Sequence, residues 1–171
     1  MTFICGSNKY KVIGENNDVI SISVSFDNLP EEIVVKGETL YFPNSFHVSL
    51  VYIQRIIERY KITIPDFKNK ILNDFCDFTK ECDVDIVHYK DEWRFCTRDN
   101  IKKTVVVMCE ISNLNKFFDF INKKYGLKIE YPTTHVTLYN TLKGKPGIYL
   151  MDNDDIKNFT VYIENPLGKL L

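Results

Sequence analysis

The sequence contains no alanine, and among its basic residues lysine far outnumbers arginine. Asparagine, isoleucine, phenylalanine and tyrosine are abundant instead, as expected of a gene with AT-rich codons. Phages, large viruses, low-GC bacteria and protists all have such genomes. The composition therefore indicates an AT-rich source, a phage or viral origin being one of several, without choosing among them.

Cysteine occurs, but without the spacing that would give it a structural role. The five cysteines form an odd set with no C-x-x-C pair and no histidine tract nearby; they are Cys5, Cys76, Cys82, Cys96 and Cys109. Such a set does not match a zinc site or a disulfide framework. We therefore expect reduced, mostly buried thiols, no metal and no cofactor.

Long apolar runs are also missing. No run approaches the roughly 20 residues that cross a bilayer, and the first residues lack a basic region followed by an apolar core. The sequence therefore predicts a cytoplasmic protein with no membrane partner.

The sequence also lacks an excess of charge of one sign. The 22 basic and 23 acidic residues give a net charge of −1, so no global attraction to polyphosphate is expected. A small nucleotide or a short RNA end is favoured as partner over a DNA duplex. The oligomeric state is not indicated.

The 171 residues, 44% of them hydrophobic, are enough for one domain with a stable core. We expect a single domain over residues 1–171, composed of two small lobes. The pattern of apolar residues predicts a mixture of strands and helices. Strands are expected over 19–26, 33–35, 41–53, 84–95, 104–111, 127–131, 134–138, 147–151 and 159–164. Helices are expected after Asp66 and after Ser112 or Asn113, while residues 54–61 suit either a helix or a strand exit.

Two short stretches far apart in the chain read almost identically. Residues 47–50 are His-Val-Ser-Leu and residues 135–138 are His-Val-Thr-Leu, and they contain two of the three histidines. Both lie in runs typical of strands. Because strand side chains alternate between faces, each histidine shares a face with the hydroxyl two residues later, while the valine and leucine face the core.

Paired H-x-[S/T]-hydrophobic motifs in a small chain resemble the two-histidine (2H) phosphoesterase superfamily, which includes RNA 2′,3′-cyclic phosphodiesterases and ligase-like relatives. The resemblance implies a bilobal α+β fold, with two antiparallel-rich sheets that face a central cleft and helices on the outside. It also implies metal-independent phosphodiester chemistry carried by His47, Ser49, His135 and Thr137.

The residue types suit that chemistry. Histidine has an ordinary pKa near 6.5, so one imidazole can act as base while its protonated partner acts as acid. The hydroxyls of Ser49 and Thr137 would donate to the non-bridging phosphoryl oxygens. Which histidine is the acid is left open.

Residues near the motifs are candidates for substrate binding. Tyr139 shares the predicted face of the second motif, where it would stack on a base, donate to phosphate or pack at the rim. Many relatives have a basic residue soon after the second motif, and Lys143 or Lys145 would supply that charge here unless they are ordinary surface lysines. Tyr41 and Phe42, before the first motif, would line the cleft or pack in the core.

The sequence therefore predicts a metal-independent phosphodiesterase for a small nucleotide or an RNA terminus. The expected substrates are a 2′,3′-cyclic phosphate, a 2′-5′ linkage, or a cyclic or 2′-5′ oligonucleotide messenger whose destruction would serve viral counter-defence. Two alternatives stay open: a nucleotide-binding sponge without turnover, and a ligase-like protein that joins RNA ends.

Overall fold

The computed structural model describes residues 2–145 and 147–168. By their internal contacts the residues divide into two compact units. Unit 1 consists of Met1–Ser23, Ser49–Val87 and Ile111–Pro132, and unit 2 of Val24–Val48, His88–Glu110 and Thr133–Leu171. The two units are described separately below, and the predicted single domain stays a prediction.

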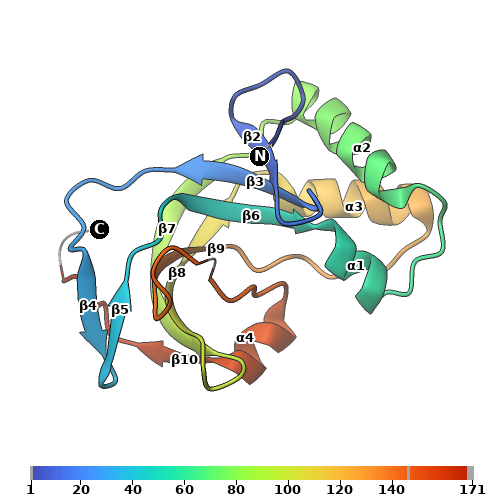
Figure 1. The fold of residues 1–171 in the computed structure, drawn as a ribbon. Helices are drawn as coiled ribbons and strands as arrows, with labels where there is room; N and C mark the ends of the chain where they lie inside the picture. Colours follow the sequence, from blue (N-terminus) through green and yellow to red (C-terminus); the bar gives the residue numbers. More distant parts are fainter. Residues whose placement is uncertain (1, 146, 169–171) are drawn as a thin grey trace. The chain divides into compact units, whose positions relative to one another are not determined.

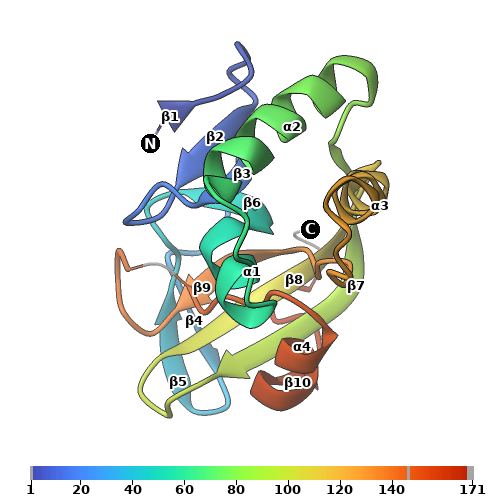
Figure 2. The same ribbon diagram turned by 90° about the vertical axis from the view of Figure 1, so that its right-hand side faces the viewer.

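Unit 1 combines short N-terminal strands with helices. Its elements are β1 (Thr2–Phe3), β2 (Tyr10–Ile13), β3 (Val19–Val24), the second part of β6 (Phe46–Tyr52), α1 (Ile53–Arg59), α2 (Phe67–Glu81) and α3 (Leu114–Tyr125). The helices predicted after Asp66 and Asn113 are confirmed, and residues 54–61 are mainly helical. Figures 1 and 2 show α2 and α3 side by side. Phe75 of α2 packs edge-on against Phe117 of α3, with ring centres 5.2 Å apart.

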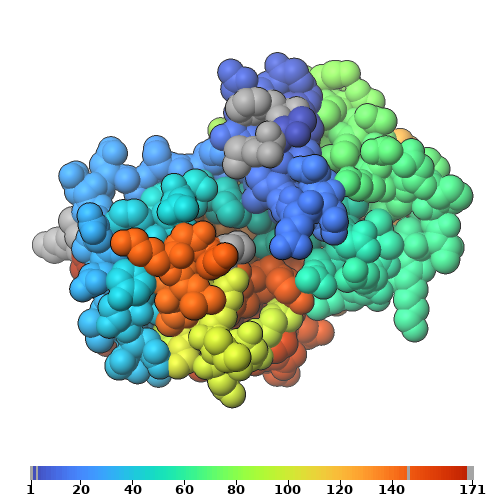
Figure 3. Space-filling model, in the orientation of Figure 1, coloured from blue at the N-terminus to red at the C-terminus, as the bar shows by residue number. Residues whose placement is uncertain are grey.

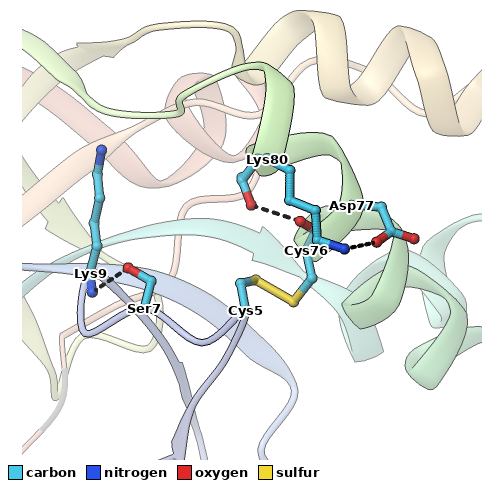
Figure 4. Close-up of a disulfide and its surroundings, with 7 residues drawn as sticks. Cys5, Ser7, Lys9, Cys76, Asp77 and Lys80 are labelled. Carbon is cyan, nitrogen blue, oxygen red and sulfur yellow. Dashed lines mark hydrogen bonds and ion pairs between the residues drawn. A yellow bond between two sulfur atoms is a disulfide. The ribbon is translucent and has the colours of Figure 1, made fainter.

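Polar and covalent links strengthen this helical unit. The buried carboxylate of Asp74 accepts from Lys124 Nζ at 2.5 Å and from the Tyr125 hydroxyl at 2.6 Å, which ties α2 to α3. A disulfide joins Cys5, in the turn after β1, to Cys76 on α2 (Figure 4). The expectation that all cysteines are reduced is therefore wrong for this pair. Nothing in the spacing of the five cysteines indicated it.

Unit 2 contains most of the strands. Its elements are β4 (Glu32–Val35), β5 (Glu38–Tyr41), the first part of β6, most of β7 (Ile86–Thr97) and β8 (Lys103–Ile111), β9 (His135–Asn140), α4 (Asn153–Phe159) and β10 (Thr160–Ile163). The β4–β5 hairpin turns through Lys36 and Gly37, both at positive φ, as a two-residue hairpin turn requires.

Within the described residues of unit 1, β1, β2 and β3 are neighbours in that order. In unit 2 the order is β6-β9-β8-β7-β10, and the β4–β5 hairpin joins these strands through β5 and β9. The predicted arrangement of two sheets about a cleft stays a prediction. The pairs from β6 to β9 and from β8 to β9 are antiparallel. The described residues therefore have an α+β fold with a large antiparallel sheet, and no helix among them is both long and apolar enough to span a membrane.

Residues 147–159 of unit 2 differ from the prediction. The expected strand over 147–151 is irregular, as is that over 127–131 in unit 1, and the residues between the expected strands 147–151 and 159–164 form helix α4. Ile148 and Leu150 nevertheless pack into a core with Cys96, Val106 and Met108. The side chains of Ile148 and Leu150 are therefore buried although the backbone of this segment forms no β-strand.

Candidate active site

Both histidine motifs lie on adjacent strands. In unit 2, β6 and β9 run antiparallel with Val48 directly opposite Val136, and both valines are fully buried. Residues one step along the strands point to the other face, so His47 and Thr137 are the next opposed pair and His135 shares their face. The predicted alternation, with histidines on one face and valines in the core, is confirmed for these residues.

His47 and Thr137 open onto a pocket of about 270 Å³. Two loops complete its wall: the segment before β6 and the segment after β9. The lining residues are Pro43, Asn44, Ser45, His47, Thr137, Gly144, Lys145 and Gly147. None of these described lining residues is acidic, and several carry hydrogen-bond donors, which is the composition expected of a site for an anion.

His135 is more deeply placed than the sequence predicted. Its side chain is only 6% exposed and is not among those that line the pocket. Its Nδ1 is buried without a hydrogen-bond partner among the described residues. A buried polar atom left in this state costs about 1–3 kcal/mol and calls for an explanation.

The two imidazoles are electrostatically coupled. Burial lowers the pKa of His47. Burial, and then the proximity of His47, lowers the pKa of His135 to about 4, against an opposing contribution from the Thr133 backbone. Both shifts favour the neutral imidazole in the unliganded protein.

The loop after β9 presses closely on the pocket. A Cβ added at Gly147 would lie 2.4 Å from Thr137 Oγ1, and one added at Gly144 would lie 3.3 Å from Asn44 Nδ2. Figure 3 shows this loop, in orange, against the cyan segment that precedes β6. Position 147 therefore requires glycine, because the Cβ of any other residue would collide with Thr137.

Hydrogen bonds hold the loop in place. Asn140, fully buried at the end of β9, donates from Nδ2 to the Lys145 carbonyl at 3.1 Å. The Lys145 amide donates to Leu142 O at 3.0 Å, and the Thr141 amide donates to Lys103 O at the same distance. The pocket wall is thus anchored at several points.

Tyr139 does not occupy the position that the sequence predicted. Its side chain is fully buried, and its hydroxyl donates to Pro30 O at 2.8 Å. Burial also raises the pKa of Tyr139 to about 12. A residue enclosed in this way packs in the core, so the predicted contact between Tyr139 and a substrate is not supported.

The other predicted binding residues surround the pocket without lining it. Tyr41 is half-buried, and Lys143 Nζ lies 6.0 Å from its ring centre. Phe42 packs near Phe46, with ring centres 6.4 Å apart. Ser49 is buried and belongs to unit 1, so its role stays a prediction.

Asn44, Ser45 and Gly147 line the pocket but were not predicted as site residues. Their only sequence signal is proximity to the motifs, within loops rich in proline and glycine. Lys145 was considered only as a source of charge, and the structure places it in the wall beside His47.

The described residues contain no group of three or more His, Cys, Asp or Glu side chains able to hold a metal ion. Comparison with protein-family models, curated proteins and solved structures found no match. The resemblance to 2H phosphoesterases therefore stays a prediction from the two sequence motifs.

Proposed function

We propose that this protein is a metal-independent phosphodiesterase that acts on a small nucleotide or an RNA terminus through His47 and His135. The observation that carries the proposal is the antiparallel pairing of β6 with β9 at Val48 and Val136, from which the alternation of strand side chains gives His47, Thr137 and His135 a common face. Electrostatic coupling of the two imidazoles supports it, because an acid and a base must reach the same phosphate.

The pocket has the hydrogen-bond donors that a phosphodiester needs. Asn44, Ser45 and Thr137 offer neutral donors. Hydrogen bonds to an ionised acceptor are shorter and about twice as strong as neutral ones. A phosphoryl group in this pocket would meet donors and no repelling carboxylate from the lining residues.

Substrate binding would also set the protonation states. The unliganded protein favours the neutral form of both imidazoles, but an adjacent anion favours the charged form of a histidine. One imidazole, protonated in this way, gives its proton to the leaving oxygen as the P–O bond breaks. The other takes a proton from the attacking water or hydroxyl as the new P–O bond forms, while Thr137 Oγ1 donates to a non-bridging oxygen.

The test is a panel of 2′,3′-cyclic nucleotides, cyclic di- and trinucleotides and 2′-5′ oligoadenylates, incubated with the protein in chelator. We expect turnover of at least one class, which His47→Ala and His135→Ala each lower about 10²- to 10⁴-fold. The matched control is His88→Ala, since His88 is 55% exposed and faces Glu110. Wild-type rates in both motif variants, or survival of the whole panel, would refute the proposal.

One observation favours a second function, nucleotide binding without turnover. His135 is almost fully buried and its pKa is low, so a ligand that fails to raise that pKa would be held and not cleaved. Calorimetry that shows tight binding, with the ligand recovered unchanged, would favour this function over the first.

A further inference from the structure

We propose that Lys145 binds a second anionic group of the ligand, so that the preferred substrate is an oligonucleotide or a nucleotide with a further phosphate. This inference rests on the proposed function, because it assigns the first phosphate to the two histidines and Thr137.

Lys145 is placed at the mouth of the pocket. It lines the same wall as His47 and Thr137, yet its side chain is exposed. The histidines project from strands, whereas Lys145 belongs to the loop after β9. Its ammonium is therefore suited to a part of the ligand that extends outward from the motif residues.

The charge of Lys145 is not neutralised within the described part of the chain. Other lysines form ion pairs, among them Lys9 with Asp83 and Lys124 with Asp74. No carboxylate of residues 2–145 or 147–168 pairs with Lys145, and none lines the pocket. The mouth thus keeps a positive charge that a single phosphate held deep in the pocket would leave unused.

The size of the pocket supports the same conclusion. Its volume of about 270 Å³ is slightly below the range of roughly 300–1,000 Å³ that encloses drug-sized ligands. A ligand with its phosphate at His47 would extend past Lys145 into solvent. In an oligonucleotide the next phosphate lies in that outer part.

The backbone at Lys145 is held by hydrogen bonds before a ligand arrives. Asn140 and Leu142 fix its backbone at Lys145, and Gly147 fits tightly on Thr137. Because these contacts already restrict the loop, little conformational entropy is lost when Lys145 meets an anion. A usable affinity can therefore come from one exposed lysine.

The experiment compares 2′-5′-linked diadenosine with and without a 5′-phosphate, by calorimetry on the His47→Ala variant. That variant keeps Lys145 and is expected to turn the ligand over about 10²- to 10⁴-fold more slowly. We expect the phosphorylated ligand to bind about tenfold more tightly, as one charge-assisted contact provides. Lys145→Met should abolish this preference by weakening the phosphorylated ligand about tenfold, with a smaller effect on the unphosphorylated one.

Lys157→Met is the matched control, because Lys157 is exposed on α4 of the same unit and does not line the pocket. Equal affinities of the two ligands for the His47→Ala protein would overturn the proposal. So would a Lys145→Met variant that weakens both ligands equally, since the lysine would then contact the shared linkage. Full turnover in His47→Ala would instead refute the proposed catalysis, and it is measured separately.

Discussion

The contact between Gly147 and Thr137 makes a sharp prediction for Gly147→Ala. The new Cβ would lie 2.4 Å from Thr137 Oγ1, 2.7 Å from Cγ2 and 3.0 Å from Cβ. Ordinary non-bonded contacts are about 3.5 Å or longer, so roughly 1 Å of movement is needed. Gly147 is not at positive φ, and the cost is therefore steric and not conformational.

Thr137 cannot easily move away from the new Cβ. Its strand is paired on both sides, with Val106 of β8 opposite Thr137 and Val48 of β6 opposite Val136. Overpacking of a fixed site costs typically 1–3 kcal/mol. We expect Gly147→Ala to lower the free energy of unfolding by about 2 kcal/mol and to lower turnover, because the Thr137 hydroxyl is displaced.

A double-mutant cycle measured by urea denaturation tests this reasoning. Thr137→Ala removes Oγ1 and Cγ2, so the same Gly147→Ala change should cost at least 1 kcal/mol less in that background. Gly37→Ala is the control, since a Cβ there meets no atom within 4 Å and its cost comes only from the positive φ. That cost should be the same with or without Thr137. Additive effects of Gly147→Ala and Thr137→Ala would refute the steric coupling.

Three further measurements check other features of the structure. Double replacement of Cys5 and Cys76 by serine removes a cross-link between residues with a sequence separation of 71. In the chain-entropy model this should lower the free energy of unfolding by up to about 4 kcal/mol, and an unchanged urea midpoint would contradict the disulfide. Tyr139→Phe deletes the hydrogen bond to Pro30 and should cost about 1 kcal/mol without changing KM, whereas a raised KM would restore the predicted substrate contact. The pKa of His135 is about 4 when folded and near 6.5 when unfolded, so the unfolded chain binds more protons between these values and stability falls as pH drops from 7 to 4. The loss should reach about 3 kcal/mol, and a His135→Gln variant with the same pH dependence would contradict this assignment.

Local patterns were enough to predict the main elements of the fold. Apolar residues spaced by three and four predicted α2 and α3, and Gly126 ends α3 in the left-handed conformation expected of a helix C-terminus. Strict alternation gave β3 and both motif strands. These patterns reflect burial of one face, which each element achieves largely regardless of its partners.

Helix α4 and the disulfide were missed for different reasons. Helix α4 is short and polar, so it has no apolar periodicity, although its start has a local signal in Asp152, which caps the helix by accepting from the Asp155 amide. Asp155 in turn accepts from the Met151 amide. The disulfide joins cysteines with a sequence separation of 71, and no local pattern indicates such a pair.

The site was predicted in part for the same reason. Alternation placed His47 and Thr137 on one face, and both line the pocket, but it also placed Tyr139 beside Thr137. In the structure, the β8–β9 register shifts between Val105, opposite Tyr139, and Val106, opposite Thr137. Such an irregularity breaks the period of two, and Tyr139 packs in the core.

His135 is the residue that most needs a functional explanation. A strand that served only packing would gain from an apolar residue at this position, because a buried imidazole with an unpaired Nδ1 costs stability. The neighbouring His47 adds to the penalty for protonation. Buried polar groups without a partner call for an explanation such as a catalytic role, and a phosphate anion beside both rings would stabilise the protonated form that the unliganded protein disfavours. The same burial that destabilises the strand would therefore make proton transfer depend on the bound substrate.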